Sequence, residues 1–428
     1  MVFKLICFIR RLVFLVHELP LAELSPNSTI QRRDCSALSD PKMVYDWRTM
    51  KALLLEDVRK LTVREIPDPA VPAGEVLIRV HAVGVCGTDL HLYRGDGNYN
   101  FDAQGRQVPL TVHPQILGHE FTGEIVEVGR DVPDLRPGDR VICDQGRNCV
   151  SRGRRPLCRY CASGDSHQCV YYGEHGITGL PGALADYIAM PAVNCLRIPA
   201  ALPPEQAALV EPLGCVLHAS AWMERARNRY TFGGEERIRY ALICGAGPAG
   251  LLFLQYLRNV RGFDAGVLVS DPREKNLDLV RRFGGTPINV ARQDLRTAVE
   301  ELTHGERVQY LIDACGNPQV LADIPGVLSK QGTVLIYAAG HNGRDSSVID
   351  PLLFLEPTLV AAVGASGGFD SDGRSTTYRA ALELVASGRV QVLPFITHYY
   401  HALEQIQSAF ENDFGREDYI KGVLRRTH

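Results

Sequence analysis

The chain has 428 residues and a formal net charge of −3, and its composition is 45% hydrophobic and 22% charged. This length is too great for one core of ordinary size and indicates two or three domains. The small net charge excludes a field strong enough to gather nucleic acid, and we interpret the basic run at 151–159 as a solvated loop. Twelve cysteines are too few for a disulfide scaffold in so long a chain, which favours metal binding in a reducing compartment such as the cytosol.

The first 49 residues differ from the rest of the chain. Residues 1–16 read MVFKLICFIRRLVFLV, an apolar run that contains three basic residues and no acidic one. Such a run fits a targeting segment, a membrane anchor or an interfacial helix, and its charges make it a poor spanning helix. A polar stretch follows, so we expect 1–49 to be an extension that is poorly ordered or directs targeting, with residues 1–20 able to associate with a membrane.

Two patterns follow in chain order. Residues 50–200 contain short runs between turn residues, among them EVLIRVHAVGV, TGEIVEVG and ALADYIAMP, which predict a mostly β module. From about 201 to 364, apolar strands such as YALICGAG and VQYLIDACG alternate with helix-length segments such as REKNLDLVRRFG. Continuous apolar strands that alternate with helices predict a parallel sheet covered on both faces. The last sixty residues contain two helical stretches around a strand-like VLPFITHYY, and an α/β fold class is expected.

A glycine-rich turn follows the first apolar strand of the second region. Its spacing is Gly245-x-Gly247-x-x-Gly250, and a helix begins there. In a dinucleotide-binding turn the first glycine makes the tight turn, the second lets a pyrophosphate approach the backbone, and the third lets helix and strand pack closely. The start of the helix, which includes Ala249, presents free N–H groups to the phosphates. We therefore expect a nucleotide site here; a purely structural turn is the alternative.

The next strand ends in Asp271. An acid at this position accepts hydrogen bonds from the adenosine ribose and repels a 2′-phosphate, so NAD is favoured over NADP. Arg273 and Lys275 follow closely and could bind an extra phosphate, which leaves NADP as the alternative.

Four cysteines cluster at Cys149, Cys158, Cys161 and Cys169. A C-x2-C pair with two further thiolates completes the tetrahedron of a structural zinc ion, and four sulfur ligands leave no position open for catalysis. The alternative is a surface loop with free thiols. Cys143 competes with Cys149 as the first ligand.

A second set of candidate ligands is spread along the chain. Cys86 lies in VGVCGTDLH, His119 and Glu120 in LGHEF, and Glu211 in LVEPLG. A catalytic metal needs such ligands together with an open position for water or substrate. Taken separately, each residue is better explained as a structural one, because the spacing brings no two of them together except the adjacent His119 and Glu120.

The motifs GVCGTDLH, ILGHEFTGEIVEVG, PGDRV, EPLGCVLHA and ICGAGPAG, with the four-cysteine lobe and the later acid, occur in an order that resembles the zinc-dependent medium-chain dehydrogenase/reductase family. The resemblance covers the chain from about Met50 and is greatest to the polyol, sorbitol and threonine dehydrogenase branch. It implies a GroES-like β-rich catalytic domain at 50–200, completed by about 365–428, and a Rossmann doubly wound NAD-binding domain at 201–364. It also implies a catalytic zinc ion held by Cys86, His119 and Glu120, with Glu211 on the metal or its water.

Two features depart from the family pattern. Arg155 occupies the usual place of the first lobe cysteine, while counting forward from PGDRV puts Cys149 there with an insertion after it. The segment RGDGNYNFDAQGRQVPLTVHP is longer than in most relatives and is expected near the pocket entrance, where it could alter substrate choice.

The resemblance implies oxidation of a secondary hydroxyl in a polyol, sugar or related small alcohol. Zinc would act as a Lewis acid that lowers the pKa of the hydroxyl, and NAD would receive the hydride. Thr88 is expected to take the hydroxyl proton and His91 to pass it toward solvent. The alternatives are a threonine or simple secondary-alcohol dehydrogenase, a zinc-free reductase of the same fold and a non-catalytic nucleotide-binding relative. By analogy with relatives, a homodimer or homotetramer is expected.

Overall fold

The computed structural model describes residues 48–340, 349–365 and 367–426, and the first strand begins at Thr49. The expected extension lies outside the described residues, apart from its last two. No described helix is long and apolar enough to cross a membrane.

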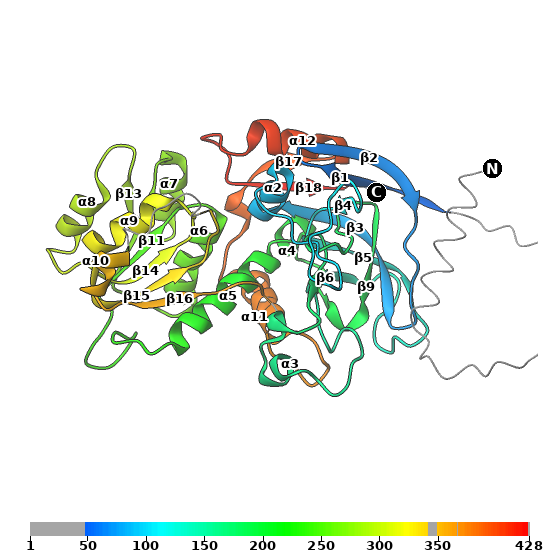
Figure 1. The fold of residues 1–428 in the computed structure, drawn as a ribbon, viewed down its shortest axis with the longest axis horizontal. Coiled ribbons are helices and arrows are strands. Elements are labelled where there is room, and N and C mark those ends of the chain that lie inside the picture. The colour runs from blue at the N-terminus through cyan, green and yellow to red at the C-terminus, as the bar shows by residue number, and fades with distance from the viewer. Residues whose placement is uncertain (1–47, 341–348, 366, 427–428) are drawn as a thin grey trace, which may run out of the picture. The chain divides into compact units, whose positions relative to one another are not determined.

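The first region forms sheets that are antiparallel except for the parallel pair β17 and β18 (Figure 1). A three-stranded sheet has the order β2-β1-β4, and a seven-stranded sheet has the order β10-β6-β5-β3-β18-β17, with β9 also paired to β3. The strands of the first sheet are β1 (Thr49–Asp57), β2 (Lys60–Pro67) and β4 (Gln115–Ile116). Those of the second are β3 (Glu75–Val85), β5 (Glu120–Val128), β6 (Arg140–Cys143), β9 (Tyr187–Pro191), β10 (Cys195–Arg197), β17 (Ile396–Tyr400) and β18 (Lys421–Arg425). A separate two-stranded ribbon pairs β7 (Gly146–Arg147) with β8 (Gly173–Glu174).

Two C-terminal strands belong to the seven-stranded sheet, although about 300 residues separate them from β3 along the chain. β18 runs antiparallel to β3, with Gly422 opposite Val85 and Val423 opposite Gly84. This register carries Lys421 toward the residue that follows β3, which is Cys86.

The second region is one parallel sheet of six strands in the order β13-β12-β11-β14-β15-β16. The strands are β11 (Tyr240–Cys244), β12 (Gly266–Asp271), β13 (Thr286–Asn289), β14 (Val308–Asp313), β15 (Leu328–Ile336) and β16 (Thr358–Ala361). Alternate residues enter two different clusters: Ala241 and Ile243 of β11 pack in one, Leu242 and Cys244 in the other. Both faces are therefore buried, which is why these strands read as continuous apolar runs. This order is that of a doubly wound nucleotide-binding fold.

Helices cover the sheets and connect the strands. They are α2 (Gly87–Arg94), α3 (Arg159–Ser163), α4 (Pro204–Ala207), α5 (Val210–Arg225), α6 (Pro248–Gln255), α7 (Glu274–Arg282), α8 (Leu295–Leu302), α9 (Pro318–Val327), α10 (Ile349–Leu353), α11 (Thr376–Ala386) and α12 (Ile406–Ser408). The helix predicted in ALEQIQSAFEN is broken into a 3₁₀ turn, the short α12 and a π turn. The predicted α/β fold class, with a β-rich module and a parallel-sheet module, is confirmed.

Candidate active site and metal centres

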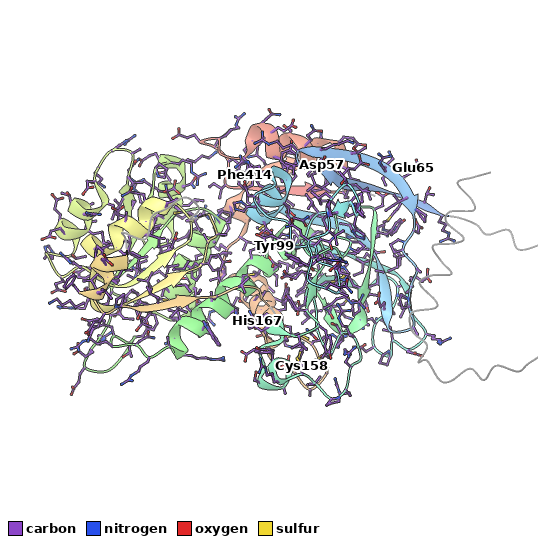
Figure 2. All side chains as sticks on the ribbon, in the orientation of Figure 1. Asp57, Glu65, Tyr99, Cys158, His167 and Phe414 are labelled. Carbon is purple, nitrogen blue, oxygen red and sulfur yellow. The ribbon has the colours of Figure 1, made fainter. Side chains whose placement is uncertain are left out.

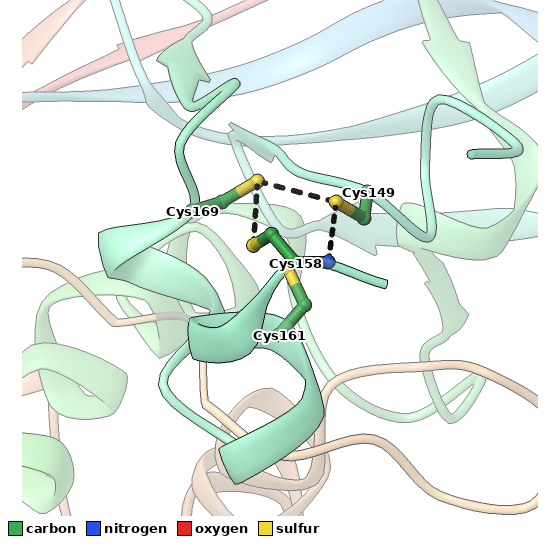
Figure 3. A group of neighbouring side chains, drawn as sticks. All are labelled: Cys149, Cys158, Cys161 and Cys169. Carbon is green, nitrogen blue, oxygen red and sulfur yellow. Dashed lines mark hydrogen bonds between the residues drawn. The ribbon is translucent and has the colours of Figure 1, made fainter. Parts of the chain in front are cut away.

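The four lobe cysteines come together around one point (Figure 3). Sγ of Cys169 lies 3.7 Å from Sγ of Cys149 and 3.8 Å from Sγ of Cys158. Thiolates at the corners of a zinc tetrahedron, each about 2.3 Å from the ion, would be about 3.8 Å apart. The spacing of these sulfurs therefore fits a structural zinc ion. Cys158 and Cys161 come from the single turn of α3, which explains their C-x2-C spacing.

Electrostatics in the lobe also favour a cation. Backbone N–H groups lower the pKa of Cys158 to about 6, so this sulfur ionises readily. Burial raises the pKa values of Cys161 and Cys169, and interactions with the neighbouring thiols add to the rise. A divalent cation offsets this cost, because it stabilises all four thiolates at once.

The structure decides whether Cys149 or Cys143 is the first ligand of the four-cysteine lobe. Cys149 lies in the cluster, and the backbone N–H of Cys158 points to its sulfur at 3.4 Å. Cys143 instead faces Cys195 across strands β6 and β10, with their sulfurs 3.6 Å apart. Arg155, at the usual first position of the lobe, is exposed.

A second cluster joins Cys86, His119 and Glu120, whose ligand atoms all lie within 4.8 Å of one another. Cys86 is the N-cap of α2 and follows directly on β3, while Glu120 begins the neighbouring strand β5. Strand pairing places Glu120 opposite Gly84, so the two chain segments meet at the ends of adjacent strands. His119 and Glu120 are buried, and Oε2 of Glu120 has no hydrogen-bond partner among the described residues. An orphaned buried carboxylate oxygen beside a thiol and an imidazole fits a bound metal ion.

Asp89, which the sequence reading did not select, orders two of these residues. Its buried carboxylate accepts a hydrogen bond from the backbone N–H of Cys86 at 2.9 Å. Its other oxygen lies 3.5 Å from Nδ1 of His119, an ion-pair distance at which no well-formed hydrogen bond is present. Burial alone would lower the pKa of His119, but the charges of Asp89 and Cys86 raise it well above its usual range. The same negative field favours a metal ion at this position. A carboxylate behind a metal-binding histidine is a common arrangement.

Lys421, like Asp89, was not selected from the sequence. Its Nζ donates to Oε1 of Glu120 at 2.6 Å, and both side chains are almost completely buried. Burial lowers the pKa of Lys421, but the charges of Glu120 and Cys86 outweigh this effect and raise it. A charged lysine thus holds one oxygen of Glu120 and leaves the other oxygen free. Lys421 is 301 positions from Glu120, so no local sequence pattern predicts the pair.

Glu211 lies in the first turn of α5, close enough to the three candidate ligands for the charges of His119 and Glu120 to affect its pKa. Burial raises that pKa to about 7. Oε1 of Glu211 accepts from Nε2 of Gln145 at 2.9 Å and from Sγ of Cys215 at 3.4 Å. Glu211 is not among the residues whose ligand atoms lie within 4.8 Å of one another. Its expected role on the metal or on the metal-bound water stays a prediction.

Thr88 and His91 both lie on α2, which begins immediately after Cys86. They are three positions apart and so share a face of the helix. Thr88 is partly buried, and Nδ1 of His91 lies 3.3 Å from Oδ2 of Asp96 near the surface. Their order, from a position beside Cys86 to a solvent-exposed one, is compatible with the expected proton relay.

The long insertion after α2 packs against a later loop. Asn100 lies so close to Gly179 that any side chain at Gly179 would collide with it. A bridge pairs Phe101 with Gln107, and the aromatic side chains of Tyr99 and Phe101 remain exposed (Figure 2 labels Tyr99). The influence of this loop on substrate choice stays a prediction.

The glycine turn has the geometry that its spacing predicts. Gly245 has a φ of 100°, which favours glycine, and a side chain at Gly250 would collide with the carbonyl oxygen of Gly245. Gly247 is the N-cap of α6, and Ala249 lies in its first turn. Free N–H groups at this helix start can receive a pyrophosphate.

Asp271 ends β12 beside this turn, and its carboxylate is already engaged. Oδ2 accepts from the backbone N–H of Ala246 at 2.9 Å, and Oδ1 accepts from the backbone N–H of Arg273 at 2.9 Å. The guanidinium of Arg273 also pairs with this carboxylate at 3.1 Å. Asp271 therefore supports the glycine turn as well as offering an acid to a ribose. Lys275 is directed elsewhere, because its Nζ lies 3.4 Å from the carbonyl oxygen of Asp418.

Two protein-family models match the chain, the alcohol dehydrogenase GroES-like domain over residues 72–200 and the zinc-binding dehydrogenase over residues 248–387. An L-threonine 3-dehydrogenase of Streptomyces coelicolor is 34% identical over 295 residues, which cover 67% of this chain and 76% of the relative. A zinc-binding dehydrogenase of Sinorhizobium meliloti bound to NADP is 25% identical with a TM-score of 0.71, covering 88% of this chain and 99% of that one. Galactitol-1-phosphate dehydrogenase of Escherichia coli shares the fold at 23% identity, with a TM-score of 0.70 and coverage of 88% and 100%.

Fold and site together define a dehydrogenase of the zinc-binding type. The chain belongs to the zinc-dependent medium-chain dehydrogenase/reductase family, and it is an oxidoreductase.

Proposed function

We propose that this dehydrogenase transfers a hydride from the secondary-alcohol carbon of a small polar molecule to NAD, with zinc held by Cys86, His119 and Glu120. The observation that carries the proposal is the buried group of three ligand atoms within 4.8 Å, next to an acid whose pKa is near neutrality. A second zinc ion is proposed for the four-cysteine lobe. The name of the Streptomyces coelicolor relative favours a 3-hydroxy-2-amino acid such as L-threonine over the polyols that the sequence first indicated.

The protein side of the reaction consists of holding, orienting and moving protons. When bound, zinc would supply a Lewis acid that lowers the pKa of the substrate hydroxyl. Asp89 orients His119 and Cys86, and Lys421 fixes one oxygen of Glu120. Thr88 accepts the hydroxyl proton and His91 passes it to solvent. Burial raises the pKa of Glu211 to about 7, and this acid exchanges a proton with water in the site.

A substrate screen tests the function. Purified protein is supplied with zinc and NAD and offered L-threonine, sorbitol, butane-2,3-diol and propan-2-ol, and formation of NADH is followed by absorbance. We expect L-threonine or another 1,2-amino alcohol to give the highest kcat/KM. Oxidation of sorbitol alone would favour the polyol alternative, and absence of turnover on every alcohol with both NAD and NADP would contradict dehydrogenase activity on this class.

NAD is the proposed cofactor because Asp271 places a negative charge at the end of β12. The ion pair with Arg273 weakens this charge, and one neighbour of known structure holds NADP. The preference for NAD therefore depends on whether the carboxylate repels a 2′-phosphate more strongly than the guanidinium attracts it.

The substitution Asp271→Asn tests this balance. Asparagine keeps an oxygen for the N–H of Ala246 and so preserves the glycine turn, but it removes the charge and releases Arg273. The ratio of kcat/KM for NAD to kcat/KM for NADP is expected to fall by about 10- to 100-fold. This change corresponds to the free energy of one hydrogen bond to a charged group. Asp278→Asn on the exposed face of α7 is the control. An unchanged ratio in Asp271→Asn would remove Asp271 from cofactor selection.

We also propose a homodimer formed at the β16 edge of the parallel sheet. β16 is the last strand of that sheet, and the chain around it exposes four large apolar side chains, with Phe354 83% exposed. These residues are Leu353, Phe354, Leu359 and Val363. A second copy could pair with the edge and bury them, which would remove an aggregation-prone strand edge from solvent.

The double substitution Phe354→Asp with Leu359→Asp is expected to convert a dimer into a monomer, because two buried charges would oppose association. Light scattering after size-exclusion chromatography measures the mass. Leu302→Asp, on an exposed apolar residue of α8, is the control and should leave the mass unchanged. A monomeric wild-type protein, or a double variant that remains dimeric, would contradict this interface.

A further inference from the structure

A third carboxylate, Glu174, lies beside the reaction site and has no place in the chemistry described so far. It ends the short strand β8, opposite Gly146 of β7. Gln145, the residue before this ribbon, accepts from the backbone N–H of His175 and donates its side-chain amide to Glu211. Glu174 and Glu211 are therefore both connected to Gln145, the first through the backbone of the ribbon and the second through a side-chain hydrogen bond.

A chain of contacts places Glu174 on the wall of the site. The hydroxyl of Tyr172 donates to Oε1 of Glu174 at 3.2 Å. Gly176, two residues after Glu174, lies against the backbone of Gly118, the residue before His119. Burial raises the pKa of Glu174, and the charge of His119 opposes this rise. Glu174 thus lies in the neighbourhood of the candidate metal ligands.

Two histidines also contact one another on this side of α5. The rings of His167 (labelled in Figure 2) and His218 lie 4.1 Å apart, and His218 is on α5, seven positions after Glu211. Along this side of α5 the exposure rises from Glu211, which is buried, through Cys215 and His218 to Trp222, which is exposed. This side of α5 therefore runs from the neighbourhood of the candidate ligands to the protein surface.

Glu174 differs from Glu120 in having no ion-pair partner among the described residues, and the one side-chain hydrogen bond that its carboxylate accepts among them comes from Tyr172. Glu120 is paired with Lys421, and Glu211 is held by Gln145 and Cys215. Among the ion pairs of the described residues none includes Glu174, and burial raises its pKa. The residue is nevertheless only partly buried. A carboxylate in this condition is stabilised by a cation that brings its own hydrogen-bond donors.

We propose that Glu174 binds the ammonium group of the substrate and so selects 1,2-amino alcohols over diols and simple secondary alcohols. The proposal rests on the proposed function and narrows its substrate class. In this arrangement the hydroxyl to be oxidised points to Cys86, His119 and Glu120, while the neighbouring ammonium donates to Glu174. Glu174 acts in recognition, and the hydride and proton transfers do not use it.

The test compares two pairs of compounds that differ only at the amine. 1-Amino-2-propanol is compared with propane-1,2-diol, and L-threonine with 3-hydroxybutanoate, using the zinc-loaded protein with NAD. Wild type is expected to favour each amine by at least about 10-fold in kcat/KM, as a charge-assisted hydrogen bond provides. Glu174→Gln keeps the shape of the side chain and the contact with Tyr172 but removes the charge. It should raise KM for the amines about 10- to 100-fold, change kcat less, and leave the amine-free compounds within about threefold.

Two further variants complete the design. Glu174→Asp restores the charge and should recover part of the selectivity. Glu65→Gln, on an exposed acid of β2 labelled in Figure 2, is the matched control and should match wild type. Equal effects of Glu174→Gln on amines and diols, or a wild type that does not favour amines, would overturn the proposal.

A binding measurement distinguishes failure of the ammonium-site proposal from failure of the proposed function. If no alcohol is oxidised, calorimetry with 1-amino-2-propanol and propane-1,2-diol on the NAD-loaded wild type and Glu174→Gln still reports recognition. Tighter binding of the amine that is lost in Glu174→Gln would support Glu174 as the ammonium site despite the absence of turnover. Equal binding of both compounds to wild type would overturn it.

Discussion

Replacement of His119 by alanine is expected to reduce kcat by at least about a thousandfold and to lower the zinc content by about one ion per chain. His119 is one of three candidate ligands, and its Nδ1 lies 3.5 Å from the carboxylate of Asp89. Loss of a bound Lewis acid removes several kcal/mol of transition-state stabilisation, and each 1.4 kcal/mol corresponds to about tenfold in rate. Affinity for NAD should change little, because the glycine turn belongs to the parallel-sheet region. Turnover, metal content and NAD affinity are measured on the same preparation.

The control for this prediction is His401→Ala, on an exposed histidine after β17. It should retain wild-type zinc content and activity, which separates the loss of a ligand from the loss of any imidazole. Full activity in His119→Ala, or in wild type after removal of all zinc, would contradict the proposed metal chemistry. Loss of NAD affinity together with activity would indicate that His119→Ala disturbs the fold instead.

The second large effect is expected from Cys161→Ser in the four-cysteine lobe. Cys161 is buried in the sulfur cluster, and a serine oxygen is a much poorer ligand for zinc than a thiolate. Removal of one ligand should release one zinc ion, and with it the free energy that metal binding contributes to folding, which destabilises the protein by several kcal/mol. The melting temperature should fall by on the order of 10 °C. Differential scanning fluorimetry and metal analysis measure the two effects.

Cys315→Ser is the matched control, since Cys315 is exposed and lies outside the cluster. Its zinc content and melting temperature should equal those of wild type. If Cys161→Ser also keeps two zinc ions and an unchanged melting temperature, the lobe does not hold a structural metal ion. The catalytic zinc should remain in Cys161→Ser, so residual activity at low temperature distinguishes the two centres.

Much of the architecture could be predicted from periodicity. The apolar runs that alternate with helices became β11 to β16, and the glycine turn lies between β11 and α6 as expected. The family that the ordered motifs indicated is confirmed by two domain models. These successes have one cause: strands, turns and nucleotide loops are encoded by residues close together in the chain. The helix predicted near the C-terminus was interrupted, because the packing of Phe410 against Tyr93 and the core around it overrides local helix propensity.

The first zinc ligand of the four-cysteine lobe could not be identified from local sequence spacing alone. The sequence favoured Cys149 but left Cys143 as a competitor, and only the pairing of β6 with β10 showed that Cys143 faces Cys195 instead. The roles of Thr88, His91 and Glu211 remain predictions, although the structure places Thr88 and His91 on one helix and Glu211 near the candidate ligands.

The sequence by itself determined the α/β class, the nucleotide turn, the family and the residue types from which two metal centres can be built. Tertiary structure alone decided which residues support the candidate catalytic centre: Asp89 near His119 and Lys421 on Glu120. The physical reason is that a buried charge is tolerated only beside a compensating group, and that group can come from any part of the chain. Lys421 reaches Glu120 because β18 pairs with β3, a contact between segments that no short-range pattern encodes.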